Sequence, residues 1–157
     1  MIRVFIAAVL LALVPAIHDA AAQAKDGVTG FWLTEKKGVI VDIYKCGEGD
    51  LCGRTVWLKK PYNKDGSLRV DTENPDPALR DRPWCGIEVI SGLIPEGEGK
   101  WTGGSVYDPK TGLTFDFDLK LTDSGLKARG YLGVPLLGKT EDWTRAQPEE
   151  VSLCPEI

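Results

Sequence analysis

The sequence contains a single histidine, His18, and it lies in an N-terminal segment that we expect to be removed. The mature chain would then have no imidazole, which excludes Ser-His and Cys-His nucleophile pairs and histidine ligands for a metal. It would also lack the side chain that enzymes use most often as a general base near neutral pH. This absence weighs against an enzyme, and we predict no cofactor and no metal site.

An excess of positive charge is also missing. The chain has 19 Lys and Arg against 23 Asp and Glu, for a formal net charge of −4. An acidic chain without a basic stripe is a poor candidate for nucleic-acid binding, and it lacks the basic amphipathic helix of a membrane-surface binder. The apolar run over 4–14 is too short to span a bilayer, which takes about 20 residues. We therefore predict no nucleic-acid partner and no membrane-spanning segment.

The first residues have the layout of a secretory signal peptide, predicted over 1–24. The basic Arg3 is followed by the apolar run over 4–14, and then by the small-residue motif Ala22-Gln23-Ala24. A basic start, an apolar centre and an A-x-A cleavage site are the parts of such a peptide. We expect cleavage near Ala24, export to the periplasm or the extracellular space, and a single domain over 25–157.

Four cysteines remain in the mature chain, Cys46, Cys52, Cys85 and Cys154. An even number in an exported protein indicates disulfides, with three possible connectivities. Cys46 and Cys52 flank a turn-like Gly-Glu-Gly-Asp-Leu segment, and a tight hairpin can bring such positions within bonding distance, which favours Cys46–Cys52. Cys85 then pairs with Cys154 by elimination and anchors the C-terminal tail. A four-cysteine zinc site is the alternative, but paired C-x₂-C spacing is absent.

Glycine is abundant, with 18 residues, and turn motifs recur at short intervals. Between the turns, apolar and polar side chains alternate, as Phe117 and Leu119 do with Asp116 and Asp118. Short alternating segments separated by turns are typical of an all-β sandwich or barrel. Eight mostly sequential strands can close into an antiparallel up-and-down barrel that has no free edge. The predicted strands are 30–34, 39–45, 52–59, 85–91, 101–107, 113–121, 126–132 and 139–144.

One connection, 60–84, is much longer than a hairpin turn. Asn74 is a favourable helix N-cap, and Asp76 suits the first helical turn, where it stands four residues before Arg80. These signals predict one short helix over 75–82, in the connection between the third and fourth strands.

The long connection is expected to form a strap across one end of the barrel, held by packing of Leu79 and by the disulfide at Cys85. In this scheme the charges of Asp71, Glu73 and Arg82 have no structural use. These three residues are therefore the first candidates for a polar binding site.

Aromatic side chains are the other candidates for a ligand site. Trp57, Trp84, Trp101 and Tyr107 can line a pocket, because aromatic residues dominate small-molecule sites. They are also ordinary core residues of any β-protein. The choice depends on the interior, since a barrel of this size is either filled by side chains or holds one small ligand.

Asp116 and Asp118 form the best pair of carboxylates for hydrolysis. Two positions apart on a strand, they share one face at about 6.6–6.8 Å along the backbone, close to the carboxyl separation of inverting glycosidases. The simpler interpretation is that Phe115, Phe117 and Leu119 point inward, so that both aspartates face water.

Two other motifs have simple structural interpretations. Asn63-Lys64-Asp65-Gly66 is similar to the middle of a calcium loop, but Pro61 and Thr72 stand at two ligand positions, so an Asp-Gly turn is expected. Gly103-Gly104 is expected to form a β-bulge where a small barrel bends.

An ordered set of motifs resembles a known family. It starts with Gly30-Phe31-Trp32, includes Arg82-Pro83-Trp84-Cys85-Gly86 and closes with Trp143-Thr144-Arg145. Between these stand Cys46-Gly47, Leu51 to Leu58, Asn74-Pro75-Asp76, Trp101 to Pro109 and Arg129 to Gly133. The set is similar to the exported bacterial proteins grouped as domain-of-unknown-function family 2147, over nearly the whole mature chain. That family implies no established activity.

A second resemblance is to the lipocalin-like (calycin) barrels. These carry Gly-x-Trp on the first strand and an arginine near the last strand, and Gly30-Phe31-Trp32 and Trp143-Thr144-Arg145 fit this plan. The resemblance implies structural roles for Trp32, Trp143 and Arg145, with Arg145 packed across the Trp32 ring by a cation–π contact.

The sequence therefore predicts an exported, all-β, eight-stranded antiparallel lipocalin-like barrel with one short helix. Its expected function is to bind a small, partly apolar ligand. The alternative is a structural or interaction protein of the cell envelope without a small ligand. A third hypothesis is a carbohydrate-active hydrolase that uses Asp116 and Asp118. The sequence does not indicate an oligomeric state.

Overall fold

The computed structural model describes residues 27–147 and Cys154, so the predicted signal peptide, 1–24, lies outside the described residues. Two short 3₁₀ helices lie in connections between strands; they are η2 (Pro77–Leu79) and η3 (Pro135–Leu137). Within this part of the chain, no helix is long and apolar enough to cross a membrane. The strands are β1 (Gly30–Leu33), β2 (Val39–Cys46), β3 (Asp50–Leu58), β4 (Glu88–Gly97), β5 (Lys100–Asp108), β6 (Leu113–Thr122), β7 (Gly125–Tyr131) and β8 (Lys139–Arg145).

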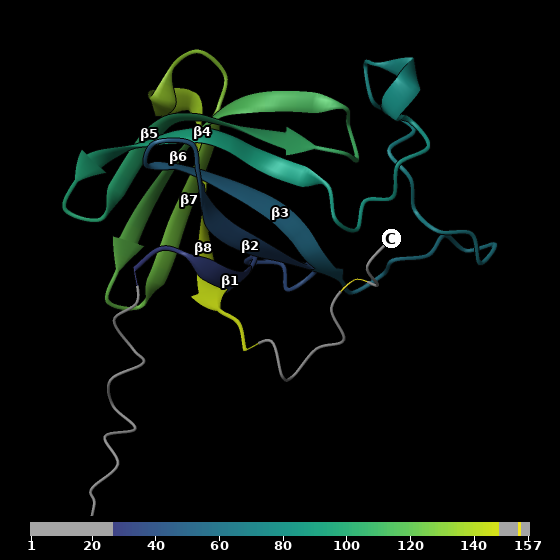
Figure 1. Cartoon of the computed structure of the whole chain (residues 1–157), viewed down its shortest axis with the longest axis horizontal. Coiled ribbons are helices and arrows are strands. Elements are labelled where there is room, and N and C mark those ends of the chain that lie inside the picture. Colours follow the sequence, from purple (N-terminus) through teal and green to yellow (C-terminus); the bar gives the residue numbers. More distant parts are fainter. Residues whose placement is uncertain (1–26, 148–153, 155–157) are drawn as a thin grey trace, which may run out of the picture.

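The eight strands form a closed antiparallel barrel in sequence order (Figure 1). Each strand pairs with the next along the chain, and β1 pairs with β8. In this last pairing Trp32 stands opposite Arg145 and Leu33 opposite Thr144. The predicted eight-stranded antiparallel barrel is confirmed.

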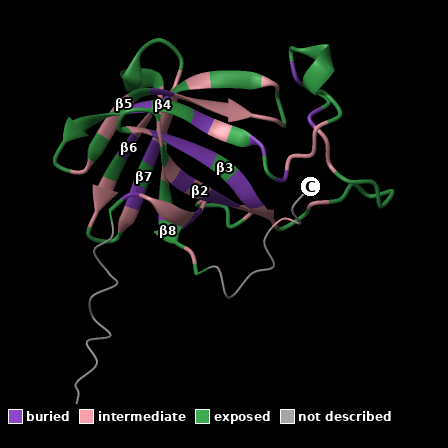
Figure 2. Cartoon of the chain, viewed as in Figure 1, coloured by how far each residue is buried: buried purple, intermediate pink, exposed green. Residues whose placement is uncertain are grey.

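The alternating pattern of the strands decides which side chains point inward. Phe117 and Leu119 of β6 are 3% and 1% exposed, whereas Asp116 is exposed. Figure 2 shows the buried positions on the strands, while most of the long connection between β3 and β4 is exposed. The core cluster comprises Val28, Trp32, Val41, Ile43, Leu51, Ile90, Leu93, Phe117, Leu119, Leu126, Ala128 and Trp143.

Side chains reinforce the contact between the first and last strands. The guanidinium carbon of Arg145 lies 3.9 Å from the centroid of the Trp32 ring, which is the contact that the lipocalin resemblance implies. The two terminal nitrogens of Arg145 donate to the carbonyl oxygens of Thr29 and Gly27, each at 2.7 Å. The indole N–H of Trp32 donates to the Val28 carbonyl at 2.7 Å. These contacts close one end of the barrel.

The predicted bulge at Gly103-Gly104 is present in β5. The pairing with β6 shifts register between Trp101 and Gly104, and Gly103 has a φ of 70°. A Cβ atom on Gly104 would lie 2.6 Å from Cγ of Leu93, so the bend brings a core side chain of β4 against bare backbone.

The fourth strand begins later than predicted, at Glu88 instead of 85. The residues before it are held on β3, because the N–H of Gly86 donates to the Thr55 carbonyl at 2.8 Å and the N–H of Thr55 donates to the Ile87 carbonyl at 2.9 Å. This segment therefore connects the strand to the long loop before the regular pairing of β4 starts.

The long connection, residues 60–84, is called the strap below and extends beyond the end of β3 (Figure 1). Its helix is shorter than the predicted 75–82, because only the 3₁₀ turn η2 forms. The residue that caps η2 is Asp76, and the predicted N-cap, Asn74, has another role. The carboxylate of Asp76, and not the side chain of Asn74, accepts the N–H of Ala78 at 2.9 Å.

Competing hydrogen bonds explain why the helix stays short. The side-chain oxygen of Asn74 accepts the N–H of Asp76 at 2.9 Å, and its amide nitrogen donates to Asp71. Nε of Arg80 donates to the Asn74 carbonyl at 2.8 Å instead of pairing with Asp76. Leu79 is 38% exposed and no residue of η2 is buried, so the apolar packing expected there is incomplete. A helix of two turns without such packing is marginal in water.

Both expected disulfides are present, Cys46–Cys52 and Cys85–Cys154. The first joins β2 to β3 beside their hairpin. The second ties the region after the strap to the C-terminal segment, where the N–H of Cys154 donates to the Val56 carbonyl of β3 at 2.6 Å. Two disulfides are typical of a protein located outside the reducing cytoplasm.

Replacement of Arg145 by Ala should lower the free energy of unfolding by about 2 kcal/mol, because a cation–π contact and two charged hydrogen bonds are lost. Urea unfolding followed by circular dichroism measures the change. Lys127→Ala is the control, since it removes an exposed ion pair with Asp142 and should cost less than about 1 kcal/mol. Equal costs for the two variants would show that Arg145 does not hold the barrel closed.

Candidate functional site

One end of the barrel opens into a cavity of about 950 Å³. The strands contribute apolar walls to it, through Val39 and Val41 of β2, Val89 of β4 and Val106 of β5. Small-molecule sites in proteins have volumes of about 300–1,000 Å³ and predominantly apolar linings. The cavity is therefore large enough and apolar enough for a small organic ligand.

Trp143 separates the cavity from the packed part of the barrel, since it belongs both to the cavity lining and to the core cluster. Its ring centroid lies 6.1 Å from that of Phe117, at an interplanar angle of 39°. The rest of the interior is filled by buried side chains such as Leu119 and Leu126, each 1% exposed. The barrel is thus part solid core and part open cavity.

The strap supplies one side of the cavity mouth through Arg69 and Trp84. The guanidinium carbon of Arg69 lies 5.2 Å from the centroid of the Trp84 ring, and the backbone N–H of Trp84 donates to the Arg69 carbonyl at 3.0 Å. The indole N–H of Trp84 is shielded from solvent and has no hydrogen-bond partner among the described residues. Arg69 and Trp84 thus form a cationic and aromatic wall, and the indole N–H of Trp84 is left without an acceptor among the described residues.

A buried carboxylate holds the strap on the barrel. Asp71 is fully buried, and its Oδ2 accepts hydrogen bonds from Nε of Arg82 at 3.0 Å and from the amide of Asn74 at 2.7 Å. Its Oδ1 accepts the hydroxyl of Tyr107, on β5, at 2.6 Å. A second guanidinium nitrogen of Arg82 lies 2.9 Å from Asp71. Asp71 and Arg82, predicted as polar site residues, are thus partners in the attachment of the strap.

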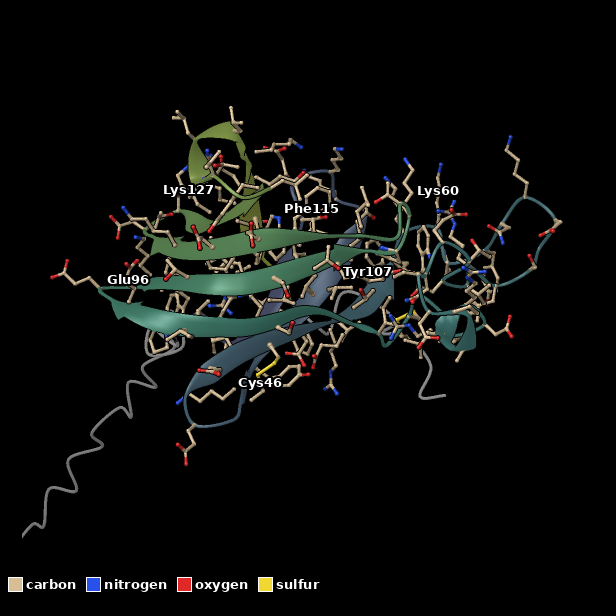
Figure 3. The ribbon with its side chains drawn as sticks, turned by 90° about the horizontal axis from the view of Figure 1, so that it is seen from above. Cys46, Lys60, Glu96, Tyr107, Phe115 and Lys127 are labelled. Atoms are coloured by element: carbon tan, nitrogen blue, oxygen red, sulfur yellow. A yellow bond between two sulfur atoms is a disulfide. The ribbon has the colours of Figure 1, made fainter. Side chains whose placement is uncertain are left out.

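Tyr107 connects this buried carboxylate to the cavity, because it also lines the cavity wall. Burial raises the pKa of Tyr107 to about 12, and the hydrogen bond to Asp71 and the charge of Asp71 add to the effect. The ionised phenolate would face a buried anion, so the phenol stays protonated at neutral pH. Figure 3 shows Tyr107 and Lys60 at the end of the barrel beside the strap, and Glu96 at the opposite end.

Glu73, the third residue of the predicted polar site, contacts the β5–β6 hairpin through its backbone. A Cβ atom on Gly112, in the β5–β6 hairpin, would lie 2.0 Å from the carbonyl oxygen of Glu73. Gly112 also has a φ of 70°, so this close approach of strap and hairpin requires glycine. The side chain of Glu73 is exposed.

Trp84 and Tyr107 line the large cavity, as the sequence analysis predicts for pocket residues, whereas Trp57 lies elsewhere. Trp57 lines a separate cavity of about 270 Å³, together with Ile40, which is its partner across β2 and β3. The β2–β3 pairing shifts register just after Ile40, where Val41 stands opposite Thr55, and Val41 and Thr55 both line the large cavity. The alternation of apolar and polar residues in the sequence does not reveal such a shift of register.

Trp101 also lies away from the large cavity. It stands opposite Leu119 of β6 and packs against the core cluster. Trp101 is partly buried and is absent from the lining of the large cavity.

Asp116 and Asp118 lie on the outer face of β6, opposite to the buried Phe117. Asp116 accepts the N–H of Gly133 at 2.9 Å, and Asp118 accepts the hydroxyl of Tyr131 at 3.3 Å. Neither aspartate lines the large cavity. Burial and the nearby Asp118 charge raise the pKa of Tyr131. The geometry supports the simpler interpretation of the pair as solvent-facing residues.

Sequence reasoning missed the basic residues of the cavity mouth. Lys36, Lys59, Lys60 and Lys110 belong to the lining together with Arg69. They are scattered along the chain in turns, where lysines are usually solvated, and no spacing connects them. The two Lys-Lys dipeptides, Lys36-Lys37 and Lys59-Lys60, are the only local signal that could have pointed to them.

Within the described part of the chain, no group of three or more His, Cys, Asp or Glu is arranged to hold a metal ion. The carboxylate of Asp71 is already occupied by Arg82 and Tyr107. The cavity lining is thus made mainly of apolar side chains, five cationic side chains and two carboxylates, those of Asp108 and Glu141.

Comparisons with known proteins agree with both resemblances. The model of a family described as uncharacterized protein conserved in bacteria (DUF2147) matches residues 30–145. A similar solved structure is protein HP1028 from the human pathogen Helicobacter pylori, described as belonging to the lipocalin family. The two chains are 26% identical with a TM-score of 0.66, over 78% of this chain and 84% of that chain. A comparison with curated proteins gives no match.

Tyr107→Phe should lower the free energy of unfolding by about 1.5–3 kcal/mol at neutral pH, because the buried Asp71 carboxylate loses a donor. Tyr62→Phe is the matched control, since Tyr62 is 58% exposed, and its cost should stay within about 0.5 kcal/mol. Urea unfolding measures both variants. Equal costs would contradict the role of Tyr107 in holding the strap.

The cost of Tyr107→Phe should also depend on pH. The folded-state pKa of Tyr107 is raised from 10.0 to about 12, so the folded protein keeps a proton that the unfolded chain releases. The stability that Tyr107 contributes is therefore complete below pH 10 and is lost as the pH rises towards about 12. Unfolding measured from pH 8 to 12 should show the two proteins converging, and a constant difference would contradict the raised pKa.

Proposed function

Because the chain belongs to the DUF2147 family of uncharacterised bacterial proteins and folds as a partly open lipocalin-like barrel, we propose that it is an exported binding protein for a small, partly apolar ligand. The observation that carries this proposal is the cavity of about 950 Å³. A protein whose only role was a structural one would have no need of an apolar interior open to solvent. Leaving such surface unfilled forgoes stabilisation by packing.

The lining suits a ligand that is partly apolar. Val39, Val41, Val89 and Val106 offer contact area without hydrogen bonds, while Trp84 and Tyr107 bring aromatic surface and polar atoms. Each Å² of apolar ligand surface that is buried against these walls favours binding by about 25 cal/mol. The polar groups at the mouth would fix the orientation of the ligand.

Export supports the same function. The predicted signal peptide, cleaved near Ala24, would leave a mature domain over 25–157 in the periplasm or the extracellular space. The two disulfides suit an oxidising compartment. In that location a small barrel that binds an apolar compound can carry it through water.

One observation favours the alternative, a contact protein of the cell envelope. The β7–β8 connection exposes a group of apolar side chains: Leu132 is 63% exposed, Val134 52%, Leu136 89% and Leu137 80%. Exposed apolar patches mark contact sites with proteins or membranes. The hydrolase hypothesis receives no comparable support, because Asp116 and Asp118 lie on the outer face of β6.

Val106→Trp tests the ligand-binding proposal, because an indole at this position would fill part of the cavity. The neutral fluorescent probe N-phenyl-1-naphthylamine should bind the wild-type protein, and the variant should bind it at least about tenfold more weakly. Fluorescence titration measures both affinities, after circular dichroism has shown that the variant is folded.

Val134→Trp is the matched control, since Val134 is 52% exposed in the β7–β8 connection and does not line the large cavity. Its affinity for the probe should equal that of the wild type. If the probe fails to bind the wild type, or if Val106→Trp binds it unchanged, the cavity is not a ligand site.

A further inference from the structure

Five cationic side chains stand on the lining of the large cavity. They belong to Lys36 in the β1–β2 turn, Lys59 just after β3, Lys60 and Arg69 in the strap, and Lys110 in the β5–β6 hairpin. They therefore come from separate parts of the chain that meet at the same end of the barrel, and are called the rim cations below. Within the described residues, none of them forms an ion pair.

The two carboxylates on the same lining already have partners. Glu141 accepts the ammonium of Lys139 at 2.7 Å and the indole N–H of Trp143 at 3.4 Å. Asp108 accepts the hydroxyl of Thr111 at 3.0 Å and a backbone N–H of the same turn at 3.0 Å. In the described part of the chain no ion pair joins either carboxylate to a rim cation. Against the effect of burial, the contacts with Lys139 and Trp143 lower the pKa of Glu141, and the more distant charge of Lys36 adds to this.

The charge of the cavity mouth is opposite to that of the whole chain. Five positive and two negative side chains on the lining leave a formal charge of +3, although the chain carries −4. A cleft that is lined by one sign of charge and has low-dielectric walls concentrates the field and raises the local concentration of ligands of the other sign. The mouth therefore favours an anion.

The inner lining of the same cavity is apolar. Val41, Val89, Val106 and Trp143 lie on it, and Val41 and Trp143 continue into the core cluster. A ligand that is anionic throughout would lose its hydration against this surface, and an apolar ligand without a charge would leave the rim cations unused. Only a molecule with one charged end and one apolar end suits both parts.

We propose that the natural ligand is an amphiphile with an anionic head group, such as a carboxylate or phosphate, bound with its head at the rim cations and its apolar part between the valines. The proposal rests on the proposed binding function and specifies the class of ligand. The Trp84 ring, stacked against the guanidinium of Arg69, holds this rim cation at the mouth.

The expected size of the electrostatic contribution determines how large a difference in affinity between charged and neutral ligands an experiment should measure. Four of the five rim cations are exposed lysines, so each contributes little by itself. Together they should favour an anionic over a neutral head group by about tenfold at low salt. Screening shortens the electrostatic range to about 3 Å at 1 M salt, so the preference should then largely disappear.

The test uses ligands of equal chain length that differ in charge. Decanoate, 1-decanol and decyltrimethylammonium compete with N-phenyl-1-naphthylamine for the wild-type protein at pH 8, in 20 mM and in 1 M NaCl. At low salt decanoate should displace the probe at about tenfold lower concentration than 1-decanol, and the ammonium compound should be weakest. Acetate, which has the charge but no apolar chain, should not displace the probe.

Each other outcome overturns the proposal in a distinct way. Equal displacement by the three ten-carbon compounds would leave the proposed binding function intact and remove the role of the rim cations. Displacement by acetate at the concentrations effective for decanoate would show a plain anion site. Failure of the probe to bind at all would remove the proposed function and this inference together.

Two double variants distinguish the effect of the rim cations on decanoate binding from the effect of the protein's net charge. Lys60→Gln/Lys110→Gln removes two rim cations, and should weaken decanoate about fivefold while leaving 1-decanol unchanged. Lys45→Gln/Lys120→Gln changes the net charge equally, at exposed positions that do not line the cavity, and should leave the ratio of the two affinities unchanged. An equal loss of decanoate binding in both variants would overturn the proposal.

Discussion

The architecture depends on the seam between β1 and β8. Trp32 opposite Arg145 and Leu33 opposite Thr144 are the residue pairs that join the first strand to the last. Every other strand pairing connects neighbours in the sequence. Apart from β3 and β4, which the strap joins, these neighbours are linked by short connections that close at low entropic cost. Without the seam, the barrel would be an open sheet with two unpaired edges and no enclosed interior. Arg145, stacked on Trp32, therefore sustains the cavity at the opposite end of the barrel.

The mouth of the cavity depends on a second interaction, the buried carboxylate of Asp71. The strap has little apolar packing, since Leu79 is partly exposed, and its helix is a single 3₁₀ turn. Asp71 instead gathers Arg82, Asn74 and Tyr107 around one buried charge, and a buried charge tolerates the loss of a partner poorly. The same contacts place Arg69 and Trp84 at the mouth, so the attachment of the strap and the shape of the site are linked.

The barrel and the Cys46–Cys52 disulfide could be predicted because their signals are local, and Cys85–Cys154 then followed by elimination. Alternation of apolar residues, as at Phe117 and Leu119, assigns a face to each strand position, and the spacing of Cys46 and Cys52 suits one hairpin. Predictions failed where distant groups compete for the same atoms. Asn74 was expected to cap a helix, but its amide is drawn to Asp71, whose importance depends on Tyr107 more than 30 residues away along the chain.

The sequence by itself determined the class of fold, the inward face of the strands, the pairing of cysteines and the contact of Arg145 with Trp32. Each follows from a local pattern or a motif, or, for Cys85 and Cys154, from elimination once the local pair is assigned. Only the tertiary structure decided that the barrel is partly filled and partly open, that a register shift turns Trp57 away from the cavity, and that scattered lysines surround its mouth. The volume left by packed side chains and the charge around it are sums over eight strands and their loops, and no single segment contains them.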